Sequence, residues 1–189
     1  MRLLQGALVA VIACGGSGGN AGGPAGSATF SGSIHGAPFV PRDAISANVS
    51  GLAGQSGAVV LSSTPGLCSQ LTGGKAPKDT QLLIVTALKQ QPDHTTAAPT
   101  SPGTYTVFAL DSAAFAVFVS LDTSCQDRGP SADAFGSSGS VTFTSVGDRY
   151  AGSFDLTFDA TDHGTGTFDA PGCPVLAKLV QDRSSLSCP

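Results

Sequence analysis

Cysteine can bind metal ions or form disulfides, depending on how the cysteines are spaced. The chain has five cysteines: Cys14, Cys68, Cys125, Cys173 and Cys188. They include no Cys-x-x-Cys motif, and their spacing fits neither a zinc knuckle nor a zinc ribbon. The last four form an even set that can make two disulfides in an oxidising compartment. Cys14 stands apart near the N-terminus, so the odd count needs a separate explanation.

Four cysteines allow three pairings, and spacing alone does not choose among them. We favour Cys68 with Cys125 and Cys173 with Cys188. Both bonds close local loops, and the second would fix the C-terminal tail.

Aspartate supplies all the acidic side chains, because the chain has thirteen Asp and no Glu. Asp155, Asp159 and Asp169 are expected on one solvent-facing side of neighbouring strands, and Asp162 in the turn between them. Carboxylate oxygens are the ligands that Ca²⁺ prefers, so these four are candidate Ca²⁺ ligands. The chain lacks the Asp-rich loop motif of EF-hand calcium sites. Solvated charges that oppose aggregation at a sheet edge are the simpler interpretation, and no bound cofactor is expected.

The three histidines, His35, His94 and His163, fall at turn-like positions, since two directly precede glycine and the third lies in a proline-rich stretch. None has the spacing of a zinc-binding helix. The segment 15–19 matches the Gly-x-Ser-x-Gly nucleophile motif, but it lacks the strand and helix that this motif requires. We therefore assign no catalytic residue, and an exported hydrolase using loop Asp and His side chains remains the alternative.

The elements that position these residues are predicted to be strands. Near the C-terminus apolar and polar residues alternate, which predicts a three-stranded antiparallel meander with one wet face. Val141, Phe143, Phe154, Leu156, Phe158 and Phe168 are its inward residues. Short strands at this spacing favour an all-β fold, either an antiparallel sandwich or a barrel.

Earlier strands are expected at 29–34, 44–49, 58–62, 80–88, 103–109 and 114–122. The run 80–88 is almost continuously apolar and predicts a strand buried on both faces. In the strand 114–122, Phe115, Val117, Val119 and Leu121 share one face. Glycine, serine and proline place loops at 51–57, 90–102 and 124–138, and residues 174–182 are the one segment expected to form a short helix.

The first residues look like an export signal. Arg2 is followed by an apolar stretch that ends in Val11-Ile12-Ala13-Cys14. This stretch is too short to span a bilayer, and a short apolar stretch after a cationic start is typical of an export signal. This ending resembles the lipobox of bacterial lipoproteins. The resemblance implies cleavage before Cys14 and attachment of diacylglyceryl and acyl chains such as palmitate to it. It also accounts for the odd cysteine. Gly15, rather than Asp, after the cysteine implies sorting to the outer membrane of a Gram-negative cell.

The chain then divides into a signal peptide (1–13), the lipidated cysteine with a tether (14–27) and one β domain (28–189). Seven of the thirteen residues in 15–27 are glycine, so the tether is flexible and spans roughly 20 Å as a random coil. Without Arg2 the chain carries eight basic and thirteen acidic side chains. No basic patch is present, which argues against a nucleic-acid partner.

The segments 139–144, 152–158 and 166–169 share a glycine-led alternating pattern. This pattern resembles that of small β-rich envelope lipoproteins of uncharacterised function, and it implies a fold without implying a catalytic residue. We therefore expect a lipid-anchored protein of the cell envelope, on the periplasmic or surface side. We expect a binding or structural role with an envelope protein or a small apolar ligand as partner.

Overall fold

The computed structural model describes residues 25–51, 54–159, 161–181 and 186–189. These residues form an all-β fold, as the sequence predicts. The longer strands are β3 (Asp43–Gly51), β4 (Gly54–Ser62), β5 (Thr80–Gln90), β7 (Gly103–Val107), β8 (Ser112–Leu121), β10 (Ser138–Ser145), β11 (Arg149–Thr157) and β12 (His163–Pro171). The short ones are β1 (Ser27–Ala28), β2 (Ser31–Gly32), β6 (Thr96–Ala97) and β9 (Ala134–Phe135), and the helices are α1 (Leu67–Thr72) and α2 (Pro174–Gln181).

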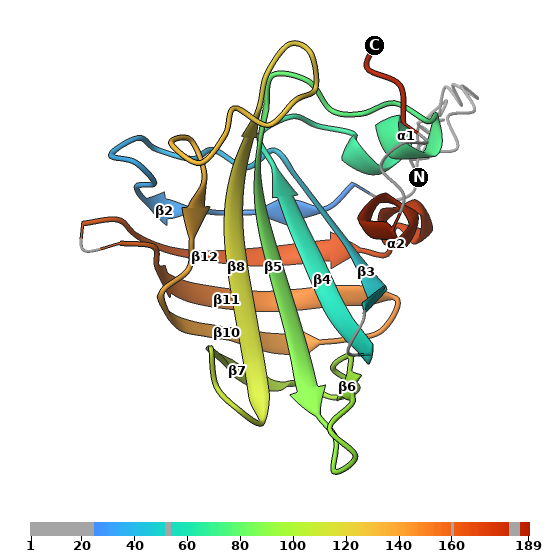
Figure 1. Ribbon diagram of the computed structural model, residues 1–189, viewed down its shortest axis with the longest axis vertical. Coiled ribbons are helices and arrows are strands. Elements are labelled where there is room, and N and C mark those ends of the chain that lie inside the picture. The colour runs from blue at the N-terminus through green and yellow to red at the C-terminus, as the bar shows by residue number, and fades with distance from the viewer. Residues whose placement is uncertain (1–24, 52–53, 160, 182–185) are drawn as a thin grey trace, which may run out of the picture.

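The strands make one curved sheet in the order β1-β12-β11-β10-β7-β8-β5-β6-β4-β3, with β2 beside β12 and β9 beside β8. β3, at one end of this order, meets β12 near the other end: the N–H of Cys173, just after β12, donates to the carbonyl of Ser46 in β3 over 2.7 Å. The Ser46 hydroxyl also donates to the Ala170 carbonyl. The sheet is therefore a nearly closed barrel, with β10–β12 crossing behind β3, β4, β5 and β8 at a steep angle (Figure 1).

The predicted C-terminal meander is confirmed. β10, β11 and β12 pair in antiparallel order, and Val141 lies opposite Phe154. Gly152 lies between Phe143 and Phe168 in this register, and the two rings meet edge to face at 5.6 Å. The alternation predicts this part correctly because one face of each strand is buried and the other is wet.

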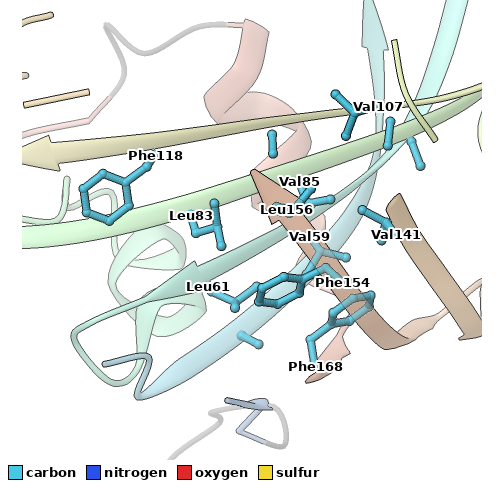
Figure 2. Close-up of a cluster of buried hydrophobic side chains, with 14 of the residues drawn as sticks. Val59, Leu61, Leu83, Val85, Val107, Phe118, Val141, Phe154, Leu156 and Phe168 are labelled. Atoms are coloured by element: carbon cyan, nitrogen blue, oxygen red, sulfur yellow. The ribbon is translucent and has the colours of Figure 1, made fainter. Parts of the chain in front are cut away.

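The barrel interior is filled by side chains from both crossing layers. One row runs across the sheet through Ala44, Leu61, Leu83, Phe118 and Ala134, which are directly paired on successive strands and all buried. Figure 2 shows Phe154 and Phe168 from the meander meeting Leu61 and Val59 of β4. These residues belong to a single buried cluster, so the barrel has a packed core.

A second apolar cluster lies on the outside of the barrel under the helices. Ile45, Val60 and Leu82 face outward from β3, β4 and β5, and Leu67, Leu71 and Leu176 cover them from α1 and α2. The helix α2 was expected from the apolar spacing, and its start and end agree with that expectation to within one residue. The helix α1 was not predicted, because its six residues are too few to show a period.

Several strand boundaries differ from the predicted ones. Residues 29–34 do not form one strand; β1 and β2 are separate two-residue strands, and Gly32 has a φ of 135°. The break expected at 51–57 is much shorter, because β3 and β4 stay paired out to Gly51 and Gly54. β6 and β9 lie within the loops expected at 90–102 and 124–138. Two strand pairs, β7 with β8 and β4 with β6, are parallel instead of antiparallel.

The disulfide pairing that we favoured from the sequence is wrong. All four predicted cysteines do form disulfides, but Cys68 pairs with Cys173 and Cys125 with Cys188. The first bond joins α1 to the residue directly before α2, and the two helices lie side by side over the outer face of the barrel (Figure 1). Local loop closure was a poor guide, because three-dimensional packing brings together cysteines that are 105 and 63 residues apart.

Candidate functional site

A groove with a volume of about 390 Å³ lies on the outer face of the barrel, where β5 and β8 pair. Its floor is aliphatic: Leu82 and Ile84 come from β5, and Val119 and Leu121 come from β8. Leu82 lies directly opposite Val119 in the antiparallel register, so the four side chains share one face. Pockets of this size with an apolar lining are typical of small-ligand sites.

Three other segments complete the groove, and they are fastened to one another. Ala76 and Pro77, the loop 125–127 and the C-terminal residues Leu186 and Cys188 supply the rest of the lining. The N–H of Ala76 donates to the carbonyl of Ser187, the N–H of Ser187 donates to Gly74, and the Cys125–Cys188 disulfide joins tail to loop. The walls are therefore formed before any ligand binds.

The groove exists because the helices cover only part of the outer face. α1 and α2 pack over β3, β4 and the start of β5, and Leu121 at the end of β8 packs against the same cluster, while Phe115, Val117 and Val119 of β8 stay exposed or half-buried. The expectation that Phe115, Val117, Val119 and Leu121 share one face is confirmed, but this face points outward. The apolar surface continues past the groove to Phe135 and Phe108, which are 65% and 60% exposed.

Phe108 holds its exposed position with a left-handed backbone, at a φ of 58°. Its ring packs edge to face against Phe115 at 5.5 Å. An aromatic residue rarely adopts this conformation, which costs free energy unless the surroundings fix it. The surrounding turn fixes this conformation, because the N–H of Phe108 donates to the carbonyl of Ala114.

One end of the groove is polar and acidic. Gln126 and Asp127 line it, and Asp127 accepts a hydrogen bond from the N–H of Gly129. Asp133 is close enough for the two carboxyl groups to interact: burial, followed by the charge of Asp127, raises the pKa of Asp133. Arg128, the nearest cation in sequence, is paired with Asp79 at 3.6 Å.

The four candidate Ca²⁺ ligands do not converge. Asp155 lies opposite Thr165 and Asp169 opposite Ala151, so about 13 Å of strand separates the two carboxylates. Asp155 accepts from His163, and Asp169 pairs with Arg149. The carboxylate of Asp159 accepts from the N–H groups of residues 161 and 162, which lowers its pKa.

Asp162, the remaining candidate, is not a solvated turn residue. It is 3% exposed, and its carboxylate accepts from the Ser33 hydroxyl and the N–H groups of His35 and Gly36. It thereby attaches the turn after β2 to the barrel. Within the described ranges no group of three His, Cys or Asp side chains is placed to hold a metal ion.

Sequence reasoning also missed Asp43, which is 4% exposed at the start of β3. One carboxylate oxygen accepts from the N–H of Ala44, and the other accepts from the N–H of Leu67, the first residue of α1. Gly66 precedes α1 and has no side chain to cap it. No sequence signal marks Asp43 as a cap, because it is 24 residues away from the helix that it caps.

The histidines form no enclosed site. His163 pairs with Asp155 at 2.7 Å, but both side chains are more than half exposed. The ring of His35 contacts the carbonyl of Asp133, and His94 occupies a left-handed turn position. None of the three lines the groove.

The predicted lipidation site, Cys14, and the glycine-rich motif at 15–19 lie outside the described residues. So does most of the expected tether. No helix in the described part of the chain is long and apolar enough to cross a membrane.

Comparison with known proteins adds no relative. No protein-family model matches the chain, and no curated protein or solved structure is significantly similar to it. Its function must therefore be inferred from its own residues.

Proposed function

We propose that this chain is a lipid-anchored binding protein of the cell envelope. In this proposal Cys14 carries the lipid, the glycine-rich segment that follows it is the tether, and the barrel presents the outer groove to a small apolar ligand. The groove is the observation that carries the proposal. It combines four aliphatic floor residues with walls that hydrogen bonds and a disulfide hold in place.

Two further features support the proposal. Two disulfides are expected in a protein that folds in an oxidising compartment, as the envelope is. The barrel interior is occupied by its own side chains, so a ligand would have to bind outside. An exported hydrolase using Asp and His side chains is the alternative. The His–Asp side-chain contact that the described residues offer it is the exposed His163–Asp155 pair, and the groove lining contains no histidine.

Binding is tested with N-phenyl-1-naphthylamine, an uncharged apolar dye that fluoresces when it leaves water. We expect saturable fluorescence with the purified full chain, and weaker binding by Val119→Gln. Val117→Gln is the matched control, because Val117 shares the outer face of β8 but does not line the groove. Equal binding by both variants, or no saturable binding, would rule out the groove as the site.

Anchoring is tested separately with Cys14→Ser. The unchanged chain should partition with the membrane fraction and carry acyl groups in its intact mass. The variant should lose both properties, because the thiol is the point of attachment. Membrane retention of Cys14→Ser would contradict the anchor.

A further inference from the structure

The polar lining of the groove selects the kind of ligand, provided that the groove binds one as proposed above. The charged side chain in that lining is Asp127, and Gln126 beside it is neutral. Asp133 adds a second carboxyl group close to Asp127. A ligand whose polar end lies here therefore meets hydrogen-bond acceptors and negative charge.

Among the described residues, lysine and arginine are absent from the groove lining, and two cations close to it in sequence are engaged elsewhere. Arg128 pairs with Asp79 at 3.6 Å, and the Lys78 ammonium donates to the carbonyl of Pro189 at 3.0 Å. Neither residue lines the groove. A carboxylate or phosphate at this end of the groove would face Asp127, and no lysine or arginine is among the lining residues that the structure describes.

The apolar part of the ligand is limited by volume. A dry cavity of about 150 Å³ holds one benzene molecule. By proportion, the groove of about 390 Å³ takes roughly fifteen carbon atoms. Leu82, Ile84, Val119 and Leu121 offer an aliphatic floor with no hydrogen-bonding group, which suits an alkyl chain or a fused hydrocarbon.

We propose that the groove binds a small amphiphile with an apolar body of this size and a hydrogen-bond-donating head, either a hydroxyl or an ammonium group, and that it discriminates against anionic heads. The body lies on the floor formed by β5 and β8, and the head lies at Asp127 and Gln126.

The test compares decylamine, decanol and decanoate as competitors of N-phenyl-1-naphthylamine on the full chain. They share a ten-carbon chain and differ in the head. Because Asp127 is exposed and its charge is screened by water, each charge contact changes affinity by about two- to fivefold. We expect decylamine to displace the dye at about three- to tenfold lower concentration than decanoate, and decanol to lie between them.

Asp127→Asn should reduce the preference for decylamine over decanoate to less than twofold without loss of dye binding. Asp111→Asn is the matched control, because Asp111 is an exposed carboxylate at the opposite end of β8. Equal or stronger binding of decanoate by the unchanged chain would overturn the head-group preference, as would an unchanged preference in Asp127→Asn. Failure of the dye to bind at all would instead remove the groove as a site.

Discussion

At the scale of single residues, aspartates that look alike in the sequence have different roles in the fold. Asp155 is exposed on the wet face of the meander, as the alternation predicts. Asp43 and Asp162 are buried and bind backbone N–H groups of distant segments. Their roles could not be predicted, because each depends on a partner that is far away in the sequence.

Asp43→Ala should lower the free energy of unfolding by about 2–4 kcal/mol. Two charge-assisted hydrogen bonds are lost, and the first turn of α1 loses its cap. Urea denaturation followed by circular dichroism measures the change. Asp43→Asn, which keeps one acceptor oxygen, should recover part of the loss. A loss below about 0.5 kcal/mol in Asp43→Ala would show that the cap is dispensable.

Asp133→Asn should stabilise the fold at pH 7 and have no effect below pH 3. Burial and the Asp127 charge raise the pKa of Asp133 in the folded state. The folded state therefore binds the proton more tightly than the unfolded state. Stability falls as the pH rises from the aspartate pKa of the unfolded state through the higher pKa of the folded state. Replacing the carboxyl group removes this loss. The melting temperature measured between pH 3 and pH 7 gives the result.

Asp93→Asn provides the control of opposite sign. Hydrogen bonds from the hydroxyl and N–H of Thr95 lower the pKa of Asp93. Its contribution to stability is present above the normal aspartate pKa and is lost on acidification. This variant should melt lower than the unchanged chain at pH 7 and converge with it in acid. Parallel pH profiles for the two variants would contradict both assignments.

At the scale of elements, regular alternation made the meander and most long strands predictable. What the pattern could not predict is which face of β8 turns outward, because both faces of this strand carry apolar residues. The groove therefore had no sequence signal of its own. The same limit applies to α1 and to the disulfides, which follow from packing on the outer face.

The two disulfides should contribute similarly to stability and differently to binding. Each closes a long loop, so each double Cys→Ser variant should lose about 2–4 kcal/mol. Cys125→Ser with Cys188→Ser frees the tail that lines the groove, whereas Cys68→Ser with Cys173→Ser leaves that lining in place. Dye affinity should fall in the first variant only. Equal affinity in the two would show that the tail is not a functional wall.

At the scale of the whole molecule, the barrel has a packed interior, and the proposed binding surface lies on its outside. Barrels that carry ligands inside need an empty interior, whereas here both tyrosines, Tyr105 and Tyr150, are buried in the core. Burial raises the pKa of both phenols, and the hydroxyl of Tyr150 donates to Asn48. All-β architecture was predictable from composition and turns, but the choice of barrel over sandwich needed the contact between β3 and β12.

The crossed disulfide pairing also sets the order in which the protein can mature. A chain that emerges N-terminus first into an oxidising space exposes Cys68 and then Cys125, and both native partners follow in the last seventeen residues. Among these four cysteines, the first bond available to a nascent chain is therefore the non-native Cys68–Cys125 bond. We expect it to form during oxidative folding and to be exchanged later by thiolate attack.

Quenching with a thiol-alkylating agent during refolding, followed by peptide mapping, should detect the Cys68–Cys125 species early and the native pairs late. A disulfide isomerase should shorten its lifetime. Direct appearance of the native pairs would instead mean that the barrel forms before oxidation. On the expected route, maturation of this protein is limited by thiol exchange, because the tail that completes the groove is made after both Cys68 and Cys125.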